Sequence, residues 1–232
     1  MSRSTERPFA GSLPVFLLSI FGLLLTVPAE ARDPLWDSLP WDTRLGVSWY
    51  EERAARGDLA AKLRAAQMHE QGIGTVADPA AAADWYAAAA ERGHPLALFK
   101  TAMAWQEGLF GDADLERSAA LYRAAAQAGV AQASFNLAVM TETGQGLPRD
   151  RAAAMELYTQ AWRQGLAQAG LNLGVLHVSA GGDPLTAYAW LAAAAEAGVA
   201  GAATQRDRLG ELLGPERVAE AEALPLPPLG QE

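Results

Sequence analysis

Residues 131–165, AQASFNLAVMTETGQGLPRDRAAAMELYTQAWRQG, have the pattern of two helices joined by a turn. Small or apolar side chains stand at positions i, i+4 and i+7 of the first segment, the spacing of one helix face: Ala133, Leu137 and Met140. Gly144 and Gly146 then predict the end of that helix and a turn.

A second helix is expected after this turn. Asp150 stands where an N-cap belongs, because its carboxylate can accept the free backbone N–H groups of a first helical turn. Leu157, Tyr158 and Ala161 supply bulky and small side chains for packing, and Gly165 suits the left-handed position that often ends a helix. We call the first helix of such a pair helix A and the second helix B.

The same landmarks recur along the chain at a fixed period. The closing glycines are 36 residues apart in three steps and 33 in the last: Gly57, Gly93, Gly129, Gly165 and Gly198. The capping aspartates keep the same steps: Asp42, Asp78, Asp114, Asp150 and Asp183. Such a period indicates a repeat protein, in which each unit buries its apolar face only against its neighbours.

Alignment on the glycines shows which side chains should pack between units. One position in helix B is bulky throughout: Trp49, Trp85, Leu121, Leu157 and Trp190. The next position is also bulky: Tyr50, Tyr86, Tyr122, Tyr158 and Leu191. A position in helix A is always alanine, which lets helices approach closely: Ala61, Ala97, Ala133 and Ala169.

The period divides the 232-residue chain into predicted parts. In order they are a signal peptide (1–31), an N-terminal segment with a capping half-repeat (32–57), four full repeats (58–93, 94–129, 130–165, 166–198), C-terminal capping helices (199–223) and a disordered tail (224–232). The predicted fold class is all-α, built from antiparallel helix pairs.

The repeat pattern resembles the Sel1-like repeats, which are relatives of the tetratricopeptide repeats. The segments FNLA at 135–138 and DWYAAAAERG at 84–93 carry the resemblance best, and it covers roughly residues 42–205. It implies a right-handed α-solenoid whose concave surface holds a protein or peptide, as in adaptors and regulators of the bacterial cell envelope. Some cysteine-rich relatives are linked to β-lactam or peptidoglycan chemistry. This chain has no cysteine, so that activity is not carried over.

The first 31 residues have the features of a secretory signal. Arg3 and Arg7 precede an apolar run over residues 13–27, and Ala29-Glu30-Ala31 matches a small-x-small cleavage site. The run is short for a bilayer crossing, which needs about 20 apolar residues. We expect cleavage after Ala31, a periplasmic or secreted protein and no stable membrane insertion afterwards; an uncleaved membrane anchor is the alternative.

Composition argues against a nucleic-acid partner. The formal net charge is −9, and the chain has only two lysines, Lys62 and Lys100. Neutralising phosphates needs clustered Lys and Arg, so no nucleic-acid binding is expected.

Catalytic and metal-binding motifs are also missing from the sequence. His69-Glu70 begins like a zinc-protease helix, but Ile73 stands where the second histidine is needed. The acidic stretch 112–116 could hold a cation, although its register with Asp78 and Asp150 favours a turn and a helix cap. We therefore expect no catalytic residues, no metal site and no cofactor.

The exposed face of helix A is the candidate binding surface. A helical wheel places three side chains of each A helix together on this face. They are Arg64, Gln67 and Gln71; Lys100, Met103 and Glu107; Asn136, Val139 and Thr143; and Asn172, Val175 and Ser179. If helix A lines the concavity, these residues form a mixed ladder that is basic at one end and could hydrogen-bond an extended peptide. An ordinary solvated face is the alternative.

Trp162 departs from its repeat position, where Ala90, Ala126 and Ala195 keep a methyl group. It either fills space left by the turn between the two helices of the fourth repeat, which is three residues shorter than in the other repeats, or marks an exposed aromatic contact.

For the whole chain we expect a secreted, non-catalytic adaptor or regulator that binds a protein or peptide in the envelope. The alternative is a peptidoglycan- or small-ligand-binding protein or hydrolase.

Overall fold

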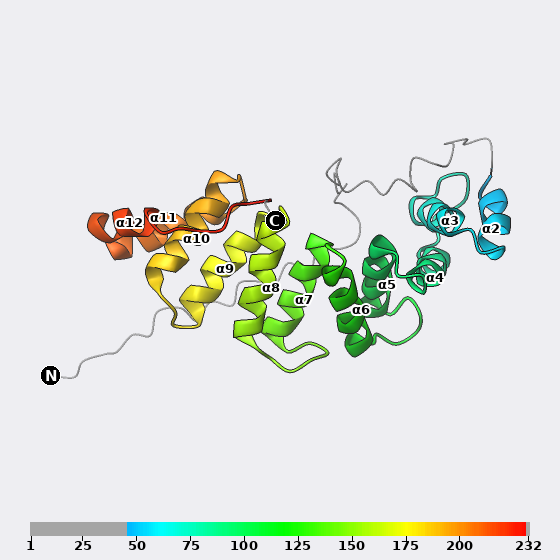
Figure 1. Cartoon of the computed structure of the whole chain (residues 1–232), viewed down its shortest axis with the longest axis horizontal. Helices are drawn as coiled ribbons and strands as arrows, with labels where there is room; N and C mark the ends of the chain where they lie inside the picture. The colour runs from blue at the N-terminus through cyan, green and yellow to red at the C-terminus, as the bar shows by residue number, and fades with distance from the viewer. Residues whose placement is uncertain (1–45, 231–232) are drawn as a thin grey trace. The chain divides into compact units, whose positions relative to one another are not determined.

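The computed structural model describes residues 46–230, and every regular element in this part is a helix (Figure 1). In chain order these helices are α2 (Val47–Ala55), α3 (Leu59–Gln71), α4 (Pro79–Ala90), α5 (Pro95–Glu107), α6 (Leu115–Gln127), α7 (Ala131–Thr143), α8 (Arg151–Arg163), α9 (Gln168–Ser179), α10 (Pro184–Glu196), α11 (Ala202–Leu213) and α12 (Pro215–Glu222). They belong to one compact unit, Asp42–Glu232. The expected signal peptide and the expected cap at Asp42 lie outside the described residues.

Consecutive helices pack in pairs, as the period predicts. The four A–B pairs are α3–α4, α5–α6, α7–α8 and α9–α10. Helix α2 packs against α3 in the position of a preceding helix B, and α11 and α12 follow the last pair. The all-helical solenoid of paired helices is thus confirmed.

The predicted caps hold the helix ends. Asp150 accepts hydrogen bonds from the backbone N–H groups of Ala152 and Ala153, both at 3.0 Å. Asp78, Asp114 and Asp183 cap their B helices in the same way. The five closing glycines have φ between +76° and +94°, a region that side chains with a Cβ rarely adopt.

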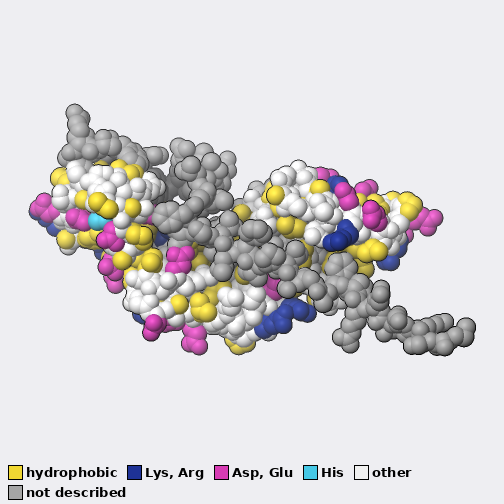
Figure 2. All heavy atoms as spheres, turned by 180° about the vertical axis from the view of Figure 1, so that it is seen from behind, with side chains coloured by type: hydrophobic (Ala, Val, Ile, Leu, Met, Phe, Trp, Pro, Cys, Tyr) yellow, Lys and Arg dark blue, Asp and Glu magenta, His cyan; other side chains and the backbone are white. Residues whose placement is uncertain are grey.

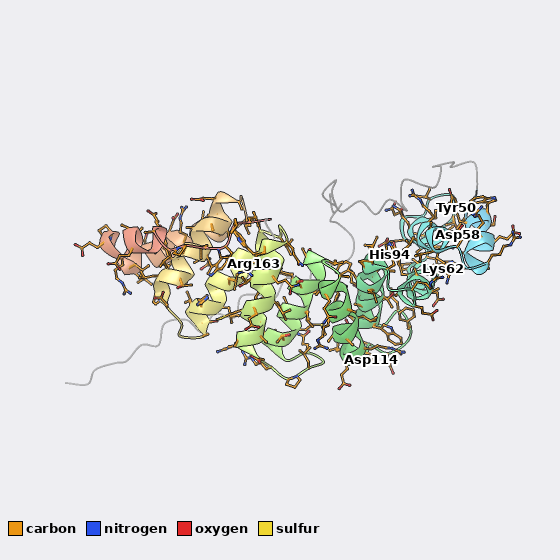
Figure 3. All side chains as sticks on the ribbon, in the orientation of Figure 1. Tyr50, Asp58, Lys62, His94, Asp114 and Arg163 are labelled. Atoms are coloured by element: carbon orange, nitrogen blue, oxygen red, sulfur yellow. The ribbon has the colours of Figure 1, made fainter. Side chains whose placement is uncertain are left out.

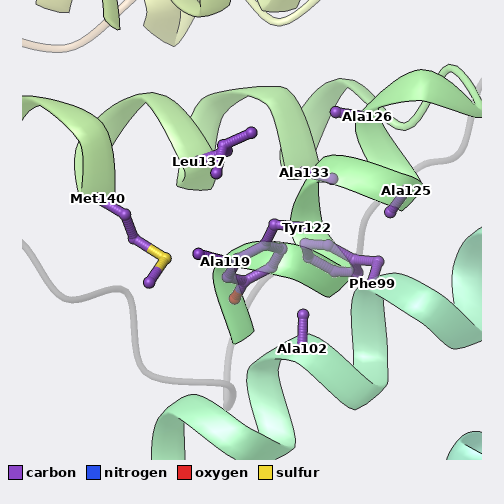
Figure 4. Close-up of a cluster of buried hydrophobic side chains, with 9 residues drawn as sticks. All are labelled: Phe99, Ala102, Ala119, Tyr122, Ala125, Ala126, Ala133, Leu137 and Met140. Atoms are coloured by element: carbon purple, nitrogen blue, oxygen red, sulfur yellow. The ribbon is translucent and has the colours of Figure 1, made fainter. Parts of the chain in front are cut away.

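The core lies between neighbouring units. The alanines expected at close approaches are fully buried: Ala61, Ala97, Ala133 and Ala169. Figure 4 shows the cluster between the second and third repeats, where the rings of Phe99 and Tyr122 have centroids 5.8 Å apart. Leu137 and Met140 of α7 complete this cluster, and each is at most 3% exposed. The predicted face of helix A is therefore correct.

The expected disordered tail does not hold for residues 224–230. Past the end of α12 this segment runs back along α10 to α8 (Figure 1). Leu226 packs against a buried cluster that includes Trp162 and Trp190. Proline-rich composition argues against helix and sheet, but it also favours a stiff extended backbone that can lie on a surface.

Candidate functional site

The candidate surface consists of three rows of helix-A side chains, with one residue of each row on each A helix. The inner row is Arg64, Lys100, Asn136 and Asn172. The middle row is Gln67, Met103, Val139 and Val175. The outer row is Gln71, Glu107, Thr143 and Ser179. The outer row is exposed, the middle row is half-buried, and the inner row is half-buried except for Arg64, which is only 6% exposed.

A series of tyrosine hydrogen bonds lies beneath the inner row. In each of the first three full repeats, the tyrosine of helix B donates its hydroxyl proton to an acidic or amide side chain of helix A. The bonds are Tyr86 to Glu70 at 2.8 Å, Tyr122 to Gln106 at 2.9 Å and Tyr158 to Glu142 at 2.9 Å. They tie the two helices of one repeat together.

Inner-row residues reach these tyrosines from the next repeat. Lys100 Nζ lies 2.5 Å from Glu70 Oε1 and 5.8 Å from the ring centroid of Tyr86. Asn136 and Asn172 hydrogen-bond the hydroxyls of Tyr122 and Tyr158. Lys100, Asn136 and Asn172 of the inner row thus join neighbouring repeats rather than standing free for a partner.

The basic end indicated by the sequence is engaged within the molecule. Arg64 donates a hydrogen bond to Gln67 Oε1 at 3.1 Å, and Lys100 is paired with Glu70. Charge reversal at either position would therefore disturb the packing of the array. The outer row and the exposed parts of the middle row remain open to solvent.

Burial governs the protonation of the tyrosines. Loss of hydration raises the pKa of Tyr86, Tyr122 and Tyr158 above the usual value for tyrosine. For Tyr86 and Tyr158, the negative charges of Glu70 and Glu142 raise the pKa further. All three hydroxyls stay protonated at neutral pH and act as hydrogen-bond donors.

Glu107 is the outer-row group with a shifted pKa. Partial desolvation raises the pKa of its carboxyl, and the positive charge of Lys100 opposes this. An exposed carboxylate beside an apolar middle row can contribute selectivity for a basic side chain of a partner.

The three histidines serve mainly structural contacts. His69 Nε2 lies 2.8 Å from Glu51 Oε1 and joins α3 to α2. His94, which is labelled in Figure 3, lies at the α4–α5 junction and caps α5 through Nδ1. Burial lowers the pKa of His177, and nearby Asp183 opposes that shift. None of these arrangements has the geometry of a nucleophile with its base.

The acidic stretch 112–116 forms the expected turn and cap. Asp114 accepts a hydrogen bond from the backbone N–H of Arg117 at 2.9 Å, while Asp112 and Glu116 are exposed. Within residues 46–230, no helix is long and apolar enough to cross a membrane.

Sequence reasoning missed the hydrogen-bond acceptors of the tyrosine series. Glu70, Gln106 and Glu142 recur every 36 residues, and each stands 16 residues before its tyrosine. That constant separation was the available signal. Its meaning depends on how helix A and helix B are rotated against each other, which the helix patterns alone do not give.

The Sel1 repeat pattern matches residues 35–58, 59–94, 95–130, 131–166 and 170–199. The chain belongs to the Sel1 repeat family. The first match is shorter than the next three and spans the predicted half-repeat, whose described helix is α2.

Solved structures of bacterial proteins share this fold. One is c5321, a protective antigen of uropathogenic Escherichia coli strains displaying an SLR fold, with a TM-score of 0.67 and 24% identity. This similarity covers 75% of the present chain but only 39% of c5321. A Sel1 repeat protein from Oxalobacter formigenes has a TM-score of 0.62 and 23% identity, over 76% of each chain. No curated protein sequence matches the chain.

Proposed function

We propose that this Sel1 repeat protein is a secreted, non-catalytic adaptor or regulator of the cell envelope. It holds a protein or peptide partner along the middle and outer rows of its A helices. The observation that carries the proposal is the regular spacing of these rows, one pair of side chains on each of four consecutive A helices. Sel1 repeat proteins are typically protein-interaction scaffolds, which supports the same reading.

The chemistry of the rows suits an extended polypeptide. Met103, Val139 and Val175 offer half-buried apolar contacts, while Gln67 and the outer row offer polar groups. A strip of this kind can bury apolar side chains of a partner and hydrogen-bond its backbone with little dependence on sequence.

Charge distribution supports a protein partner over a nucleic acid. On the face shown in Figure 2, the visible Lys and Arg side chains lie in separate places and form no continuous stripe. The net charge of −9 also disfavours binding to the phosphates of a nucleic acid. The envelope location rests on the signal-peptide pattern of residues 1–31.

The test places a photo-crosslinking amino acid at Glu107 or at Thr143 in cells that express the protein at its natural level. Matched control sites are Arg123 on α6 and Glu156 on α8, which are also exposed but belong to B helices. Both outer-row sites should capture the same envelope protein after irradiation, and the control sites should not.

A second measurement checks that the captured protein contacts this surface. With the photo-crosslinking residue moved to Ser179, which is also exposed in the outer row, the double substitution Glu107→Lys and Thr143→Lys should lower its capture severalfold without changing helicity or the melting temperature. Equal capture from outer-row and control sites would refute the proposed surface. Capture of glycan fragments alone would instead support a ligand-binding protein.

A further inference from the structure

Trp162 lies in a place where the repeat leaves no room for an indole. Ala90 and Ala126 occupy the same position in the earlier repeats. In the structure, Trp162 is 3% exposed and packs edge-on against Trp190, with ring centroids 5.5 Å apart and planes at 84°. It is therefore not the exposed aromatic contact that was one of the two expectations.

A glycine on the next helix provides the space. A Cβ atom at Gly170 would stand 2.6 Å from Cζ3 of Trp162, which is far closer than such contacts allow. The equivalent residues of the other repeats, Lys62, Leu98 and Ser134, all carry side chains. Trp162 thus fills the gap over Gly170.

The C-terminal strap, residues 224–230, is held by Trp162 and packs against the cluster that contains both tryptophans. Trp162 donates its indole N–H to the carbonyl oxygen of Pro227 at 2.8 Å. Its backbone carbonyl accepts a hydrogen bond from the N–H of Gly230 at 3.3 Å. Leu226 packs against the buried cluster that holds both indoles.

The contacts have the chemistry of recognition of an extended proline-rich peptide. Proline has no N–H, so such a peptide is held mainly through its carbonyl groups and by apolar contact with aromatic rings. Trp162 supplies the donor, and the buried cluster that holds both indoles supplies the apolar surface. The strap, with prolines at 225, 227 and 228, supplies a stiff ligand that loses little conformational entropy when it is held.

The strap lies on the surface and makes few contacts with the helices. Pro225, Pro228, Leu229 and Gly230 are exposed, whereas Leu224, Leu226 and Pro227 are half-buried. Among these strap side chains, Leu226 is the one that packs against the cluster of Trp162 and Trp190. A segment held by so few contacts can be displaced without unfolding a repeat.

We propose that the Trp162–Trp190 pair, with Gly170 behind it, is a binding site for extended leucine- and proline-rich peptide segments. Residues 224–230 are its resident intramolecular ligand. A partner segment of the same chemistry binds when it displaces the strap. This site lies on α8, α9 and α10 and uses none of the residues of the three helix-A rows, so its test is independent of the test of the proposed function.

Because the strap already occupies the site, it competes with any partner peptide and lowers the apparent affinity for that peptide. A short tether holds a ligand at an effective concentration of about a millimolar, so an added peptide binds the intact chain weakly. Weakening the strap should therefore strengthen binding of the added peptide.

The experiment measures binding of a fluorescently labelled peptide of sequence LPLPPLGQE by fluorescence polarisation. The full-length chain with Leu226→Ser should bind it about tenfold or more tightly than the unsubstituted chain, because the strap no longer competes well. Leu229→Ser is the matched control: Leu229 is in the same strap but 37% exposed, and its substitution should leave the affinity unchanged. A chain that ends at Ala223 gives a second comparison and should also bind tightly.

Two further comparisons test the chemistry. Trp162→Phe in the Leu226→Ser background keeps an aromatic ring but removes the N–H donor, and it should weaken binding severalfold. The peptide LALAALGQE, with alanine in place of proline, should bind more weakly than the original. The proposal is overturned if the Leu226→Ser chain and the chain ending at Ala223, both verified as folded by circular dichroism, fail to bind the peptide. Equal binding by the Trp162→Phe chain would also overturn it.

Discussion

At the scale of single residues, the tyrosines of the B helices connect packing to protonation. The hydroxyl groups of Tyr86, Tyr122 and Tyr158 each donate a hydrogen bond to an acceptor on helix A, while their rings fill space between neighbouring repeats. The hydroxyl therefore needs its proton for the folded state and has no such need in the unfolded chain. Because of this difference, the stability of the array should change with pH in the alkaline range.

The array should lose stability as the pH rises above about 10, where tyrosine ionises in an unfolded chain. The folded state keeps the protons of Tyr86, Tyr122 and Tyr158 because burial raises their pKa. The unfolded state then binds fewer protons, so the free energy of unfolding falls by up to about 1.4 kcal/mol per pH unit for each tyrosine. Urea unfolding at several pH values between 8 and 11 measures this slope.

Tyr122→Phe is the control for that measurement. It removes one ionisable group and keeps the ring that packs against Phe99. The slope above pH 10 should become smaller by about one tyrosine's share. An unchanged slope would mean that other groups cause the alkaline loss of stability.

At the scale of elements, the B helix of each full repeat begins at one aspartate, whereas α2 begins after Gly46 without a side-chain cap. Asp150 satisfies two of the N–H groups that a helix leaves free at its start. The glycine that ends each helix has a left-handed conformation, so both ends of helix B are set by local chemistry. The helices form where they do largely for this reason.

Asp150→Ala should lower the free energy of unfolding by about 0.5–2 kcal/mol, because two N–H groups at the start of α8 lose their acceptor. Chemical denaturation followed by circular dichroism measures the change. Asp84→Ala is the matched control, since Asp84 is exposed within α4 and alanine has the higher helix propensity. Equal losses for both variants would show that Asp150 does not act through capping.

Local chemistry also explains how much of the structure could be predicted from the sequence. Caps, closing glycines and buried alanines recur in register, so residues such as Asp150, Gly165 and Ala133 indicated the helix pairs directly. The strap could not be predicted in this way. Its contact joins Trp162 to Pro227, residues 65 positions apart that share no repeat register.

The candidate surface was only partly predictable for a related reason. A helical wheel places Lys100 and Met103 on one face of helix A, and both lie there. It does not show that Glu70 of the preceding repeat reaches Lys100, because that depends on the distance between two repeats. The inner row therefore emerged as a connection between repeats only with the structure.

At the scale of the whole molecule, the strongest helix contacts run between elements that are neighbours in the sequence. The protein is a linear array in which stability spreads from one repeat to the next. A substitution that destabilises a central repeat should therefore also destabilise the repeats on both sides of it. Leu137 lies in such a place, packed with α5 and α6 in the cluster of Figure 4.

Leu137→Ala should lower the free energy of unfolding by about 2–5 kcal/mol, the usual effect of removing a buried leucine side chain. Hydrogen exchange should accelerate in α6 and α8 as well as in α7, and less in the end helices α2 and α12. A loss below about 1 kcal/mol would contradict the assigned packing. Faster exchange confined to α7 would contradict coupling between repeats.

The fully buried alanines at 61, 97 and 133 have a consequence for how such a chain can change its length. Because successive boundaries present the same small residue, a gene duplication that copies one 36-residue unit among the first repeats creates a new boundary with the same buried alanine. The boundary of Trp162 with Gly170 is different, since its shape is matched to one strap that arrives from the C-terminus. Copy number can therefore vary upstream of residue 162, whereas the last pair and the strap have to be inherited together.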